Sequence, residues 1–138
     1  MATLELWLRL ASLLTLLGAL LGAYGLIAPR SAAKFAGLIV GPEQSPFAAV
    51  RAVCGGCLLM HAASFTALAE APKIGSCLAA AAGAAWLGQA AGRAISSLLA
   101  RSPNRRQLAL LVVQGLIGLA LWAPLWTYLK LIREGARI

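Results

Sequence analysis

Cys54 and Cys57 form a Cys-x-x-Cys pair, the arrangement that cycles between dithiol and disulfide in thiol oxidoreductases. Membrane enzymes of that kind place the pair at a helix end beside a quinone, and a second pair of cysteines relays the electrons. The one remaining cysteine, Cys77, is expected near the start of the next helix, most of a membrane thickness away, so the chain has no relay pair. We therefore favour a packing role for these small apolar side chains, with redox chemistry as the alternative.

His61 is the only histidine, and it follows Cys57 by one helical turn. A structural zinc site needs about four ligands, which two thiols and one histidine do not provide. A haem would need a second axial ligand, such as Met60 or a residue of another chain. We favour a histidine that is hydrogen-bonded between helices, and we predict no metal and no cofactor.

Acidic residues are scarce: the sequence has no aspartate, and its four glutamates lie at the termini or in predicted loops. A Ser-His-Asp arrangement is therefore excluded. A proton-coupled multidrug antiporter is also excluded, because it needs a carboxylate within a membrane span. We predict no catalytic residue.

Two arginines, Arg51 and Arg93, lie a turn or two inside long apolar stretches, and Gln89 and Gln114 lie at comparable depths. An arginine at mid-bilayer costs about 2.5–3.5 kcal/mol on insertion scales, and less near an interface. Two cations and two amides without a carboxylate predict an anion site for a phospholipid headgroup, a carboxylate or a phosphate. In the alternative, which we favour, both guanidiniums reach the interface or bond helix-end carbonyls.

The stretches that carry these residues are long, apolar and nearly uncharged, and each exceeds the roughly 20 residues that cross a hydrocarbon core. They run approximately over Leu4–Ala28, Phe47–Ala69, Ile74–Leu99 and Leu108–Leu129. Lipid offers no partner to backbone polar groups, so each stretch must be a helix. The sequence predicts an all-α fold in which residues 1–138 form a single transmembrane domain, an antiparallel four-helix bundle.

Composition agrees with this fold: 61% of the residues are hydrophobic and the mean hydropathy is +0.83. The net charge of +8 would suggest nucleic acid in a soluble protein. Here the basic residues cluster at helix ends, so we expect contact with membrane lipids, including anionic ones, and not with nucleic acid. The apolar run from Leu10 to Ala28 exceeds a signal-peptide core, so we expect the first helix to be retained.

Breaks between the stretches predict how the helices connect. Pro29 should stop the first helix, and residues 31–37 could form a short interfacial helix with Ser31 as its N-cap. Turns are expected at Gly41-Pro42, at Glu70–Lys73 and at residues 101–106. Four antiparallel helices place both termini on one face, and the basic residues slightly favour the opposite face, a weak indication that the termini lie outside.

Small residues at four-residue spacing predict close helix contacts. They are Gly18 and Gly22 in the first helix, Ala52 and Gly56 in the second, and Gly88 and Gly92 in the third. Because these ridges lie at similar depths, we expect the tightest packing in the half away from the termini. Packing within one chain is favoured over a homodimer seam. Pro124 should bend the last helix.

Three short motifs stand out: Gly25–Pro29 at the end of the first helix, Val50–Gly56 at the start of the second and Gly88–Arg93 in the third. With these motifs the chain resembles the DUF4345 family of uncharacterised bacterial proteins with four predicted spans. The resemblance extends over nearly the whole chain. It implies a bacterial inner membrane protein and implies no activity.

Three functions remain open from the sequence. The favoured one is a small non-catalytic membrane protein, an accessory subunit or lipid-associated packing protein, within a homo-oligomer or a larger membrane complex. The second is a carrier or binder of an anionic lipid or small anion through Arg51 and Arg93. The third is a MAPEG-like membrane enzyme, whose arginines would bind a glutathione-like thiol, although the asparagine and glutamate expected beside them are missing.

Overall fold

The computed structural model describes residues 2–37, 45–99 and 105–135, and within these ranges it contains helices and no strand. The helices are α1 (Ala2–Ile27), α2 (Pro29–Phe35), α3 (Ser45–Glu70), α4 (Pro72–Leu99) and α5 (Arg105–Arg133). All of them except α2 are long and apolar enough to cross a membrane, which gives four candidate spans. The prediction of an all-α bundle of four apolar helices is confirmed, and the protein is an integral membrane protein.

Large apolar side chains cover the outside of the bundle. Ile27, Leu98 and Leu99 are each more than three-quarters exposed, an arrangement that suits a lipid surrounding. Buried hydroxyl groups bond to carbonyls of their own helix, as Thr15 does to Ala11 and Ser64 to Met60. Among the described residues, no buried side-chain nitrogen or oxygen lacks a hydrogen-bond partner.

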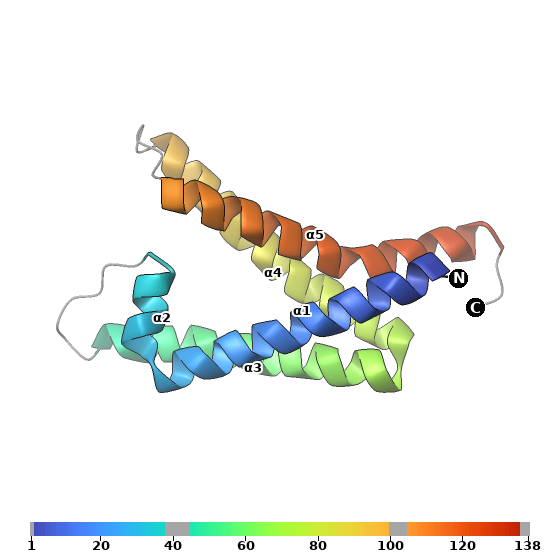
Figure 1. Ribbon diagram of the computed structural model, residues 1–138, viewed down its shortest axis with the longest axis horizontal. Coiled ribbons are helices and arrows are strands. Elements are labelled where there is room, and N and C mark those ends of the chain that lie inside the picture. Colours follow the sequence, from blue (N-terminus) through green and yellow to red (C-terminus); the bar gives the residue numbers. More distant parts are fainter. Residues whose placement is uncertain (1, 38–44, 100–104, 136–138) are drawn as a thin grey trace.

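The four long helices are arranged as two pairs, α1 with α3 and α4 with α5. The pairs are in contact at the end of the molecule that holds the start of α1 and the end of α5, and they separate toward the other end, beside α2 (Figure 1). We call these the terminal end and the α2 end. As predicted, α1 begins and α5 ends at the same end of the bundle (Figure 1).

The buried core lies nearer the terminal end. It consists of Ala11, Leu68, Ala79, Ala82 and Leu121. The expectation that the bundle packs most tightly in the half away from the termini is therefore wrong. The two helix pairs diverge toward the α2 end, so close contact between small residues and a neighbouring helix is kept there within a pair, as between Gly22 of α1 and α3, and not between the pairs.

The glycines of the predicted ridges differ in whether they touch a neighbouring helix. A methyl group on Gly22 would lie 2.5 Å from the backbone nitrogen of Leu58 in α3, so the two helices touch there. Within the described chain, a methyl group on Gly56, Gly88 or Gly92 would meet nothing within 4 Å. The expectation of close packing within the chain is thus not met at these three glycines.

A different ridge of small residues carries the packing of α4. Gly75, Ala79 and Gly83 are buried at four-residue spacing, and a methyl group on Gly83 would lie 2.7 Å from the carbonyl oxygen of Gly118 in α5. The spacing of these residues in the sequence is the same signal as that of Gly88 and Gly92. Gly88 is five residues from Gly83 and therefore lies on a different face of α4, where neither it nor Gly92 has a neighbour within 4 Å in the described chain.

Local backbone chemistry sets the connections. Ala28, with φ −124° and ψ 63°, breaks the helix between α1 and α2, and Pro29 takes the first position of α2. The short helix therefore begins two residues earlier than predicted, and Ser31 is not its N-cap. Gly37 ends α2 with φ +76°, a conformation that glycine adopts readily.

Between α3 and α4 the hairpin is a single residue, Ala71, whose N–H donates to the carbonyl of Ala67. The predicted turns at Gly41-Pro42 and at residues 101–104 lie outside the described residues. Pro124 is buried inside α5, and α5 bends along its length (Figure 1).

Candidate functional site

Arg93 of α4 is the centre of a polar network at the α2 end. Its Nε donates to Oε1 of Gln114 at 2.9 Å, and its Nη1 donates to Oε1 of Gln107 at 2.6 Å. Its Nη2 donates to the carbonyl oxygen of Ala36, just after α2, at 3.0 Å. Gln114 is buried and donates in turn to Oε1 of Gln89 at 3.0 Å. Neutral oxygens thus take the place of a carboxylate.

Arg106 also bonds to the end of α2. Its Nη2 donates to the carbonyl oxygens of Lys34 at 2.8 Å and Phe35 at 3.0 Å. The last carbonyls of a helix have no partner within the helix and carry partial negative charge, so they suit a guanidinium. Two arginines, from α4 and α5, therefore hold α2 to the second helix pair.

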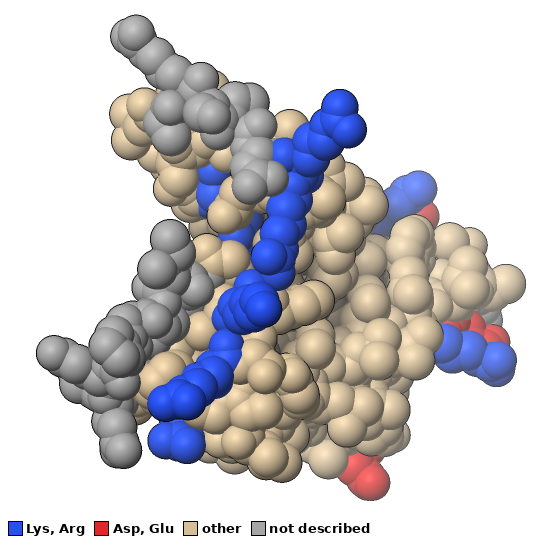
Figure 2. Space-filling view, turned by 60° about the vertical axis from the view of Figure 1, so that its left-hand side comes forward, with Lys and Arg blue, Asp and Glu red and all other residues tan. Residues whose placement is uncertain are grey.

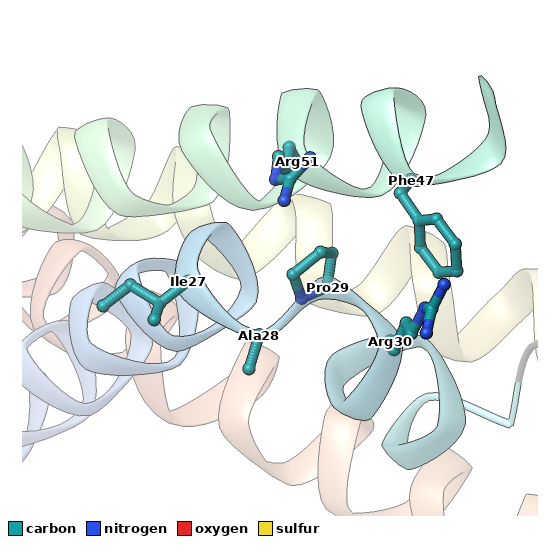
Figure 3. Close-up of a pocket in the computed structure, with 6 residues that line it drawn as sticks. All are labelled: Ile27, Ala28, Pro29, Arg30, Phe47 and Arg51. Carbon is teal, nitrogen blue, oxygen red and sulfur yellow. The ribbon is translucent and has the colours of Figure 1, made fainter. Parts of the chain in front are cut away.

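Arg51 of α3 lies at a different place. Its Nε donates to the carbonyl oxygen of Leu26, in the last turn of α1, at 3.3 Å. It lines a pocket of about 380 Å³ together with Ile27, Ala28, Pro29, Arg30 and Phe47. Figure 3 shows Arg51 and Arg30 reaching this pocket from α3 and α2, with Pro29 between them in this view.

The structure brings together only part of the predicted anion site. Arg93, Gln89 and Gln114 belong to one network, whereas Arg51 shares no hydrogen-bond partner and no described pocket with them. Both arginines bond helix-end carbonyls, which is the alternative that the sequence analysis favoured. Equal depth did not make them neighbours, because α3 and α4 diverge from their hairpin (Figure 1).

The sequence analysis did not predict Gln107 as a member of the Arg93 network, or Arg30 as a member of the pocket at Arg51. Gln107 lies two helical turns before Gln114 on the same face of α5, so its i, i+7 spacing was an available signal. Arg30 follows Pro29 at the break between α1 and α2, and no pattern in the sequence places it near Arg51.

Charge is distributed unequally between the two ends. The described basic residues at the α2 end are Arg30, Lys34, Arg51, Arg93, Arg105 and Arg106. The described glutamates, Glu5, Glu70 and Glu134, all lie at the terminal end, where Glu5 and Glu134 pair with Arg9 and Lys130. Figure 2 shows a row of basic side chains along the α2 end, and acidic side chains away from this row, at the right-hand and lower edges of the view.

A second polar cluster lies deeper in the bundle, around His61. Nε1 of Trp86 donates to Nε2 of His61 at 3.0 Å, and Nδ1 of His61 is 2.8 Å from the carbonyl oxygen of Cys57. Because the indole nitrogen can only donate, Nε2 must accept, and the imidazole proton lies on Nδ1. The histidine therefore links α3 to α4, in the role favoured from the sequence.

The cysteines are free thiols. The Sγ atom of Cys57 is 3.5 Å from Nδ1 of His61 and 3.8 Å from the carbonyl oxygen of Gly18, and Cys54 packs against Gly25 of α1. Cys77 is exposed. In the described ranges, no three histidine, cysteine or acidic residues are grouped so that they could hold a metal ion.

The His61 cluster, the Arg93 cluster and the Arg30–Arg51 pocket differ in whether their polar groups are already used within the protein. The hydrogen bonds of the His61 and Arg93 clusters run between different helices, so these clusters hold helices together. The Arg30–Arg51 pocket instead presents cationic N–H groups to an open space at the end of a span. Comparison of the chain with protein-family models, with curated proteins and with solved structures finds no match, so the geometry alone carries the functional argument.

Proposed function

We propose that this is a non-catalytic integral membrane protein that associates with anionic phospholipids at its α2 end. The observation that carries the proposal is the separation of charge: the described part of the α2 end has six basic residues and no carboxylate. Each lysine or arginine near an anionic membrane surface contributes about 1 kcal/mol of attraction. Five of the six side chains are exposed, so most of this charge faces lipid headgroups.

Orientation supports the same proposal. Basic residues that flank membrane helices favour the cytoplasmic side, where the anionic lipids of a bacterial inner membrane would meet the α2 end. The resemblance to the DUF4345 family is a separate part of the proposal, supported by the three short motifs in α1, α3 and α4. A non-catalytic, accessory role agrees with the His61 and Arg93 clusters, because their polar groups are used in hydrogen bonds between helices.

The test is native mass spectrometry of the protein purified in mild detergent from membranes that contain anionic and zwitterionic phospholipids. We expect retained lipid to be enriched in phosphatidylglycerol or cardiolipin over phosphatidylethanolamine, and the enrichment to fall as the salt concentration rises. Retained lipid in the proportions of the membrane, independent of salt, would overturn the proposal.

The matched variant for this test removes charge without removing a described contact. Arg105 is exposed, and no hydrogen bond of its side chain connects it to the described residues. Replacing Arg105 and Lys34 by glutamine should lower the enrichment. Replacing Arg9 and Lys130 at the terminal end, which removes the same charge, should leave it unchanged.

A further inference from the structure

We infer that the pocket between α1, α2 and α3 binds one phosphate group of an anionic phospholipid, with Arg30 and Arg51 as its ligands. The inference rests on the proposed association with anionic lipid and names where and how that lipid is held. It also replaces the partner expected for Arg51: the second arginine of the site is Arg30, and not Arg93.

The pocket exists because α1 stops where α3 continues. Ala28 and Pro29 turn the chain away from the axis of α1, and the first turns of α3 run on past this break. Phe47 and Arg51 are one helical turn apart on α3, so both face the space that the turn leaves open. The result is a hollow of about 380 Å³ with a charged side and an apolar side.

Unused hydrogen-bond donors point to a ligand. Arg51 uses only its Nε on Leu26, so both of its Nη groups have no hydrogen-bond partner among the described residues. The side chain of Arg30 donates no hydrogen bond to a described residue, and its guanidinium carbon lies 5.2 Å from the centre of the Phe47 ring. This contrasts with Arg93, whose three nitrogens are all occupied.

Charge also favours an anion in the pocket. None of the residues that line it is acidic, so a bound anion would offset its two positive charges. Guanidinium groups match the oxygens of phosphate, to which they can donate two hydrogen bonds side by side.

Position favours a lipid over a soluble phosphate. Ile27 closes the last turn of a membrane span and is 83% exposed, so the pocket opens onto the lipid-facing surface at the level where headgroups begin. Phe47 and Ala28 extend this apolar side. A phospholipid can place its phosphate on the arginines and its first methylene groups on Ile27 at the same time.

The experiment measures binding of phosphatidylglycerol to the purified protein in detergent by native mass spectrometry, for the native chain and three variants. R30Q and R51Q remove the proposed ligands, and R105Q removes the same charge at the same end outside the pocket. We expect R30Q and R51Q each to bind about tenfold more weakly, since a lost charge-assisted hydrogen bond is worth about that factor. R105Q should weaken binding less than R30Q or R51Q does, because Arg105 contributes only to the general attraction of the α2 end for anionic lipid and donates no hydrogen bond in the pocket. Far-UV circular dichroism and the melting temperature of each variant show whether its fold is retained, and R51K serves as a second variant if R51Q is unstable.

The outcomes separate this site from the general association. Equal weakening by R105Q, R30Q and R51Q would overturn the pocket and leave the proposed attraction to anionic lipid standing. Native-like binding by R30Q and R51Q would also overturn the pocket, whereas a native chain that binds phosphatidylglycerol no better than phosphatidylethanolamine would overturn the association as well. Displacement of phosphatidylglycerol by millimolar inorganic phosphate or glycerol phosphate would assign the pocket to a soluble phosphate and overturn the lipid. Retention of phosphatidylglycerol in the presence of these competitors supports a phospholipid as the ligand of the pocket.

Discussion

Nε1 of Trp86 in α4 donates a 3.0 Å hydrogen bond to Nε2 of His61 in α3, and the two rings meet edge to face with centroids 6.1 Å apart. His61 is 1% exposed, so this bond lies in the interior of the bundle. It joins α3 to α4, which belong to different helix pairs, and the imidazole also lies against Gly18 of α1. Three helices therefore meet at one histidine.

Replacing Trp86 by phenylalanine should destabilise the protein. Nε2 of His61 would be left buried without a donor, at a cost of about 1–2 kcal/mol. The measurement is the melting temperature in detergent. The matched control is W126F, because Trp126 is 67% exposed and should tolerate the change. Equal melting temperatures of the two variants would show that the indole hydrogen bond contributes nothing.

Adding a methyl group at Gly18 should be costly, because it would overlap the ring of His61. We expect G18A to lower the free energy of unfolding by about 1–3 kcal/mol through overpacking. At Gly88 the same methyl group meets open space in the described chain, so G88A should be neutral or slightly stabilising.

Gly92 tests the alternative of a homodimer seam. A leucine there should leave the stability of the single chain unchanged, because the position has no neighbour within 4 Å in the described chain. Loss of a dimer in native mass spectrometry of G92L would show that this face packs against a second copy. An unchanged oligomeric state would show that it faces lipid.

Removing Arg93 should release α2 from the second helix pair. R93M deletes three hydrogen bonds and leaves the buried Oε1 of Gln114 without its partner, at a cost of about 1.5–3 kcal/mol. We expect a lower melting temperature and faster hydrogen exchange of the amides of α2. R105M removes the same charge without these bonds, and equal behaviour of the two variants would contradict the structural role of Arg93.

Both ends of the chain should lie on one side of the membrane, because four spans return the chain to the side where it began. Topology reporters fused at residues 1 and 138 should give the same result. Opposite results would mean that one of the four long helices does not cross the bilayer.

Element lengths and breaks could be read from the sequence because they depend on local physics. Long apolar stretches without backbone partners must be helical in lipid, and Pro29 cannot continue the hydrogen bonds of α1. The same reasoning placed both termini together and expected helix-end carbonyls as partners for Arg51 and Arg93.

Tertiary structure decided which side chains meet. Counting residues from helix ends gave Arg51 and Arg93 similar depths, but the angle between α3 and α4 separates them and leaves Arg51 beside Arg30. Gly83 is buried against α5 and Gly88 has no neighbour within 4 Å in the described chain, although the two glycines sit in similar patterns, because they lie on different faces of α4. The crossing angle of two helices depends on all the side chains at their interface, so it cannot be predicted from residue spacing along one helix.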